Sequence, residues 1–223
     1  MDETVARVSY REGLPGRPAR MMARPLNDKG YPVPWFVEWV DGKPEFRLMD
    51  PAKWGRAIRH RLCWLCGEAL GANMTFVSGP MCGVNRTSAE PPSHHDCATY
   101  AAKACPFLTL PKALRRDAGL PDEVRSVGGI GIARNPGVAM LWTTREFHVA
   151  RVDNGYIIKM GEPIRVEWYA QGRAATRAEV DESIRTGLPA LQQIADQQQG
   201  APELLRQYVE RFARYLPPAV AAG

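Results

Sequence analysis

The chain has 223 residues, of which 45% are hydrophobic and 24% charged, a composition that suits one or two compact domains and excludes global disorder. Its 29 Lys and Arg exceed its 24 Asp and Glu, which permits a polyanionic partner without requiring one. A membrane-spanning helix needs about 20 consecutive apolar residues, and charged residues interrupt every apolar run before it reaches that length. The first residues lack the apolar core of a secretory signal, so we expect a cytoplasmic protein without membrane contact.

The N-terminal third predicts an arm, a hairpin and a basic helix. Residues 1–30 are rich in Gly, Pro and Arg, which is typical of an irregular basic arm. Segment 34–49 holds two extended runs joined at Asp41-Gly42, a dipeptide typical of tight hairpin turns. Asp50 and Pro51 then suit the N-cap and first position of a helix that runs to about residue 62. Its basic stripe supplies our candidate nucleic-acid contacts, which are Lys53, Arg56, Arg59 and Arg61.

The C-terminal half predicts strands followed by helices. After a glycine-rich stretch at 128–137, extended runs at 138–143, 145–152, 156–160 and 163–169 predict an antiparallel meander. Thr176 and Glu179 stand at capping-box spacing and open a helix. A second amphipathic helix follows the linker at 197–200.

The cysteines give the clearest chemical signal, and all five lie between positions 63 and 105. An odd number in a chain without a signal peptide argues against a disulfide framework and favours metal binding. Cys63, Cys66 and Gly67 have the form of a zinc knuckle, in which a tight turn brings two thiolates to one point.

A second ligand pair follows at His94 and Cys97. Ser93 and Asp96 stand at capping-box spacing, so we expect a helix from about His94 to Cys105, with His94 and Cys97 on one face of its first turn. The sequence therefore predicts a closed, tetrahedral, structural zinc site with the ligands Cys63, Cys66, His94 and Cys97. Two alternatives stay open. Cys82 or Cys105 replaces one ligand, or the cysteines are buried free thiols.

These residues carry a resemblance. A knuckle followed by a helix that opens with His-x2-Cys resembles a treble-clef zinc finger over about residues 62–105, and its second pair is similar to that of zinc-bearing HNH nucleases. The phrase GPMCGVNRTSAEPPSHHDCATYAAKACPFL also resembles uncharacterised proteins of bacteriophages and their hosts, which implies no activity.

Nuclease activity does not carry over with the resemblance. HNH enzymes have a catalytic histidine between the two zinc pairs, whereas this chain has no histidine from Gly67 to Ser93. The sequence therefore lacks a general base to activate water. Asn85 and His95 match the family's asparagine and last histidine only by position.

Together these patterns predict an α+β protein with a treble-clef zinc module. We expect an irregular basic arm at 1–30, the hairpin, basic helix and zinc module at 31–125, and the meander and two helices at 126–223, packed together. The predicted function is binding without catalysis, by a zinc-stabilised, phage-related protein that acts on nucleic acid or a host protein complex. The alternative is a small enzyme, such as a degenerate HNH-like nuclease or another hydrolase. Four aromatic residues are either base-stacking platforms or apolar anchors of the hairpin, namely Trp35, Phe36, Trp39 and Trp54.

Overall fold

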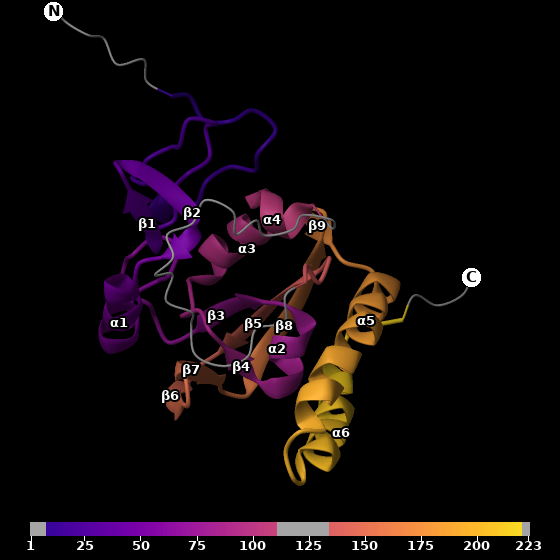
Figure 1. The fold of residues 1–223 in the computed structure, drawn as a ribbon. Helices are drawn as coiled ribbons and strands as arrows, with labels where there is room; N and C mark the ends of the chain where they lie inside the picture. Colours follow the sequence, from indigo (N-terminus) through magenta and orange to yellow (C-terminus); the bar gives the residue numbers. More distant parts are fainter. Residues whose placement is uncertain (1–7, 111–133, 220–223) are drawn as a thin grey trace, which may run out of the picture.

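The computed structural model describes residues 8–110 and 134–219, and Figure 1 shows their arrangement. The N-terminal elements are the 3-10 helix η1 (Ala19–Met21), strands β1 (Val37–Val40) and β2 (Lys43–Met49), and helix α1 (Pro51–His60). Asp41 and Gly42 both have positive φ, which confirms the predicted hairpin turn, because its backbone twist matches that of the strands. The Asp50 carboxylate accepts hydrogen bonds from two backbone N–H groups in the first turn of α1, which confirms the predicted cap.

The remaining strands form two antiparallel sheets. One has the order β3 (Met74–Ser78), β5 (Ala139–Thr144), β8 (Pro163–Ala170), β9 (Arg173–Ala174), and the other has β4 (Thr87–Ser88), β7 (Gly155–Met160), β6 (Phe147–Val152). The four predicted extended runs are therefore strands, but they do not form a meander. Strand β5 pairs with β3 and β8, while β6 and β7 form a hairpin in the second sheet. The physical reason is that β5 is buried along its whole length, so the backbone N–H and C=O groups at both of its edges need hydrogen-bond partners in neighbouring strands.

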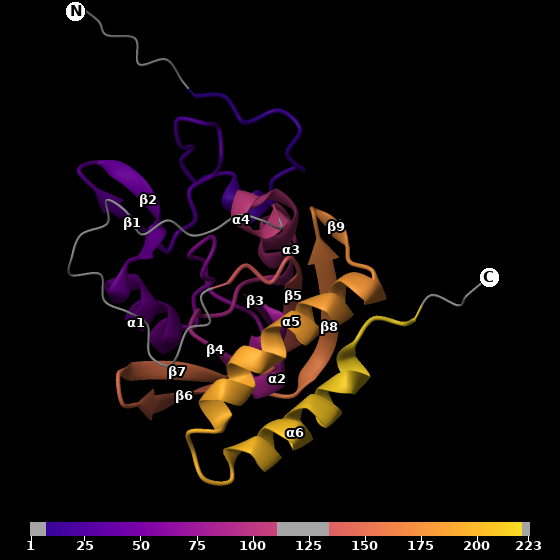
Figure 2. The same ribbon diagram turned by 45° about the vertical axis from the view of Figure 1, so that its right-hand side comes forward.

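The helices cover both faces of the larger sheet. They are α2 (Pro80–Asn85), α3 (His95–Ala104), α4 (Pro106–Thr109), α5 (Arg177–Ala195), α6 (Ala201–Phe212) and the 3-10 helix η2 (Ala213–Tyr215). Figure 2 shows α5 and α6 crossing one side of the sheet. The predicted capping box begins α5, since the Thr176 side chain and the Glu179 side chain each accept from the other's backbone N–H.

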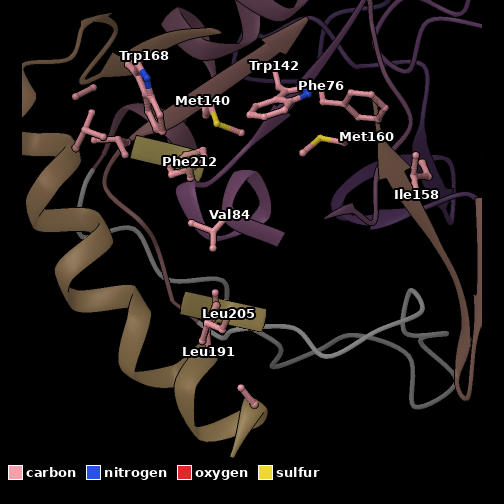
Figure 3. Packing of buried hydrophobic residues seen from close by; sticks show 14 residues of the cluster. Phe76, Val84, Met140, Trp142, Ile158, Met160, Trp168, Leu191, Leu205 and Phe212 are labelled. Atoms are coloured by element: carbon pink, nitrogen blue, oxygen red, sulfur yellow. The ribbon is translucent and has the colours of Figure 1, made fainter. Parts of the chain in front are cut away.

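Strand β5 links two separate apolar clusters because its side chains alternate between faces. Met140 and Trp142 belong to the larger cluster, which includes Phe212 of α6 and Trp168 of β8 (Figure 3). Leu141 points to the other face, where it meets the small side chains of α3. The sheet thus lies between α3 on one side and α2, α5 and α6 on the other.

The segment with the predicted zinc ligands and the C-terminal half share both sheets, because β3 pairs with β5 and β4 pairs with β7. The predicted division at residue 30 stays a prediction. The predicted boundary at 125, and residues 128–133 of the glycine-rich stretch, lie outside the described residues. Within residues 8–110 and 134–219, no helix is both long enough and apolar enough to cross a bilayer.

The close approach of α2 to α6 gives a stability prediction. A Cβ added at Gly83 would lie 2.5 Å from a Phe212 ring carbon and 2.7 Å from Met140 Sδ, and both side chains are buried. We expect Gly83→Ala to lower the free energy of unfolding by about 1–3 kcal/mol through overpacking. Gly55→Ala in α1 is the matched control, because its Cβ would meet only the Arg59 guanidinium at 3.5 Å.

Denaturant unfolding of the two variants measures the difference. Gly55→Ala should gain about 0.5–1 kcal/mol from helix propensity alone. If Gly83→Ala were stabilising by the same amount, the packing of α2 against α6 would be looser than the structure has it.

Candidate metal centre

The knuckle is a tight turn closed by its own backbone. The N–H of Cys63 donates to the carbonyl of Glu68 at 2.7 Å, and the N–H of Gly67 donates to the carbonyl of Cys63 at 2.9 Å. Gly67 has φ +86°, and a Cβ there would lie 2.7 Å from the Trp35 ring. Only glycine satisfies both the left-handed backbone and the close contact, so this residue lets both sulfurs turn to the same point.

The second ligand pair stands at the start of α3. The helix spans His95–Ala104, within one residue of the prediction, and His94 is its N-cap. The predicted capping box of Ser93 and Asp96 is wrong. Ser93 instead exchanges two 2.8 Å backbone hydrogen bonds with Thr75 of β3, which starts the helix one residue later. His94 and Cys97 still reach the same point, because one lies at the cap and the other in the first turn.

The four predicted residues come together and are buried. The ligand atoms of Cys63, Cys66, His94 and Cys97 all lie within 4.8 Å of one another. The Sγ of Cys66 is 3.4 Å from the Nδ1 of His94. Tetrahedral zinc with Zn–S and Zn–N bonds of about 2.3 and 2.0 Å requires ligand separations of about 3.5–3.8 Å. The chain therefore has a buried Cys3His cluster whose donors and spacing are compatible with zinc.

Hydrogen bonds around the cluster orient the His94 ring and favour the thiolate form of Cys63, which is the form that binds a metal ion. The Nε2 of His94 lies 3.0 Å from the carbonyl of Ala69, and because a carbonyl oxygen can only accept a hydrogen bond, Nε2–H donates to it. This hydrogen bond leaves the lone pair of Nδ1 available as a metal ligand. The N–H groups of Cys66 and His94 each donate to Cys63 Sγ at 3.4 Å. Burial opposes ionisation of the Cys63 thiol, but hydrogen bonds from its three co-ligands outweigh burial and lower its pKa. Conversely, the Cys63 sulfur raises the pKa of His94.

The N-terminal arm packs directly on this centre. Met21 is buried in the apolar cluster that contains the three cysteines of the Cys3His group. The Tyr10 and Tyr100 hydroxyls lie 2.9 Å apart. Arg20 pairs with Glu68 beside the knuckle and, at 3.5 Å, with Asp96 on α3. The sequence analysis did not predict that the arm packs on the Cys3His cluster. The sequence indicates this packing only through a few apolar side chains among the glycines and arginines of the arm.

The other two cysteines lie outside the cluster. Cys82 is on α2, and Cys105 is the N-cap of α4. Burial raises the pKa of both thiols, which disfavours the nucleophilic thiolate. Neither thiol supplies a ligand atom to the Cys3His group.

The two residues that match HNH positions are not brought together. His95 begins α3, and its Nε2 lies 2.5 Å from a carboxylate oxygen of Glu167 on β8. Asn85 ends α2, whose buried side chains belong to the cluster on the opposite face of β5. The arrangement therefore does not assemble these side chains into one catalytic group.

The predicted basic stripe is only partly free. The Lys53 ammonium donates to a β1 carbonyl and pairs with the carboxylate that caps α1. Arg61 ends the helix in the left-handed conformation and turns a guanidinium nitrogen to a buried methionine sulfur at 3.1 Å. Arg56 and Arg59 are exposed, and the Arg56 guanidinium lies 5.5 Å from the centre of the Trp35 ring. These two arginines are therefore the exposed part of the stripe on the helix itself.

Three of the four noted aromatic residues pack against other residues of the fold. The Phe36 ring stacks on Trp64 at 5.0 Å, and Trp35 meets Trp64 edge-on at 6.3 Å. The Trp54 indole donates to the carbonyl of Ala89 at 2.9 Å. The ring contacts favour the hairpin-anchor interpretation for Trp35 and Phe36, whereas Trp54 packs against the larger apolar cluster and Trp39 stays exposed.

Loss of one ligand tests the centre directly. We expect the purified protein to contain one zinc ion per chain and Cys97→Ser to lose most of it, because structural zinc contributes about 10–16 kcal/mol of apparent binding free energy. Cys105→Ser is the matched control and should keep its zinc. Elemental analysis of protein purified without chelator measures both. Wild-type protein without zinc, or Cys97→Ser with full zinc, would contradict the assignment.

Comparison with known proteins identifies no relative of this chain. No protein-family model matches the chain, no curated protein matches it, and no solved structure matches it. These comparisons therefore do not support the resemblances to HNH nucleases and to bacteriophage proteins. The interpretation of the Cys3His cluster as a metal site is based on its geometry alone.

Proposed function

We propose that this chain is a zinc-stabilised cytoplasmic binding protein, in which the Cys3His centre is structural and the partner is nucleic acid. We further assign the centre to the treble-clef type. A knuckle, a strand that bridges back to the segment before the second pair, and a helix that begins at that pair support the assignment. The resemblance to bacteriophage proteins adds a biological context and no activity.

The observation that carries the proposal is the closure of the metal centre. Catalytic zinc sites use three protein ligands and keep one position for water or substrate, whereas structural sites use four. Here four protein donors converge, and none of their residues is more than 9% exposed. Such a centre holds the knuckle to α3 and leaves no ligand position for a reacting molecule.

The distribution of charge favours a polyanionic partner. Residues 8–62 contain 11 Lys and Arg against 6 Asp and Glu, a surplus equal to the net charge of +5 of the whole chain. Phosphate contacts from Arg and Lys supply most of sequence-independent nucleic-acid affinity. Arg56 and Arg59 are the exposed cations on α1, and the first zinc ligand, Cys63, follows this helix directly in the chain. A protein partner is the alternative that the binding measurement distinguishes.

Cobalt substitution tests the closed centre. We expect Co²⁺-loaded protein to show the visible absorption of a four-coordinate Cys3His site, unchanged by added azide or other small anions, because no solvent ligand is present to exchange. A spectrum that shifts on anion addition would favour the enzyme alternative. Plasmid cleavage with a divalent cation that is lost in His95→Ala would favour an HNH-like enzyme.

Charge reversal tests the partner. We expect Arg56→Glu/Arg59→Glu to weaken the binding of duplex and single-stranded DNA at least about tenfold at low salt, and wild-type binding to fall steeply as salt rises. Arg145→Glu/Arg211→Glu changes the net charge equally at exposed residues of the C-terminal half and should have a much smaller effect. Fluorescence anisotropy measures the affinities. Absent binding at low salt would reject nucleic acid and leave a protein as the partner.

A further inference from the structure

The hairpin of β1 and β2 carries an exposed aromatic tip. Trp39 pairs with Pro44 across the hairpin, so these two side chains share one face, and Phe46 lies two residues further along β2, where the register of the hairpin shifts. Trp39 is 45% exposed and Phe46 is 42% exposed. In the described part of the chain, neither ring makes a ring–ring or cation–π contact, unlike the other aromatic residues of this region.

The core does not require these two rings. The base of the hairpin is held by Val37 and Leu48, which are 0% and 6% exposed. Its link to the body is polar as well, because Lys53 of α1 donates to the carbonyl of Val37 at 2.9 Å. Two large apolar rings at a tip that the base already anchors indicate a contact surface, since tryptophan is a frequent hot-spot residue in binding sites.

The tip and the exposed cations belong to one continuous unit of the chain, formed by the hairpin and α1. The capped start of α1 follows β2 directly, and Figures 1 and 2 both show the hairpin next to α1. Arg56 lies against the Trp35 ring, which itself covers Gly67 of the knuckle. Aromatic faces beside guanidinium groups are the two components of single-strand binding surfaces, where bases stack and phosphates pair with cations.

We propose that single-stranded nucleic acid binds to this unit, with unpaired bases stacked on Trp39 and Phe46 and the phosphate backbone at Arg56 and Arg59. The inference rests on the proposed nucleic-acid function and adds the strand state of the ligand and the residues that recognise it. A duplex hides its base faces, so it contacts only the cations. Because every base has a π-face, binding tolerates any sequence.

The experiment compares two probes and two variants in the full, zinc-loaded chain. The probes are fluorescein-labelled oligo-dT of about 20 nucleotides and a duplex of the same length. Trp39→Leu/Phe46→Leu keeps apolar side chains at the tip but removes the aromatic faces. Phe107→Leu is the matched control, because Phe107 is 40% exposed on α4, away from the hairpin.

We expect the hairpin variant to bind oligo-dT about tenfold or more weakly while its duplex affinity changes less than about twofold, since each stacked base contributes substantially. Phe107→Leu should bind both probes as wild type does. Equal thermal unfolding of the three proteins checks that the hairpin variant is folded.

The other outcomes separate the two proposals. Unchanged oligo-dT binding in Trp39→Leu/Phe46→Leu, together with loss in Arg56→Glu/Arg59→Glu, would overturn this inference and leave the proposed function standing. Equal weakening for oligo-dT and duplex would also overturn it, because the rings would then only support the hairpin. Wild-type protein that binds neither probe would reject the proposed nucleic-acid function itself.

Discussion

The convergence of four buried ligand atoms on one point is the constraint on which the N-terminal half depends. Cys63 and Cys66 belong to a turn, while His94 and Cys97 belong to the start of a helix, and the cluster brings the two segments together with the hydrogen bond from the Trp64 N–H to the carbonyl of Pro92. These four donors are compatible with zinc, and a metal ion bound by them would couple the folding of this region to metal binding. The N–H groups aimed at Cys63 Sγ are compatible with such a metal ion.

Neighbouring elements are fixed in turn by this centre. The arm places Met21 in the cysteine cluster, and Trp35 covers the knuckle glycine. The hairpin and α1 are tied to that layer by the lysine that reaches from α1 to β1. The hairpin and α1 are therefore connected to the Cys3His cluster through a series of packed and hydrogen-bonded residues.

Strand β5 is the second constraint, and it connects the two halves. One of its faces packs on α3, which begins at the His94–Cys97 pair of the Cys3His cluster, and the other packs on the cluster of α2, α5 and α6. Disruption at either face is expected to reach the other through a strand that is buried at every position. Since β3 and β4 come from the segment that carries the Cys3His cluster, the C-terminal strands complete sheets that the N-terminal half begins.

The sequence by itself determined the features that depend on a few consecutive residues. The Asp41-Gly42 turn, the Asp50 cap, the Thr176–Glu179 capping box and the two ligand pairs are all set by backbone conformation or hydrogen bonds within one turn, and each could be predicted. The order of the strands could not, because alternation reveals which face of a strand is apolar but not which strand lies beside it. Tertiary structure also decided the role of Ser93, since a bridge to a strand 18 positions earlier displaced the local cap. The same holds for the arm, because the other buried residues of the cluster that contains Met21 all lie more than forty positions away.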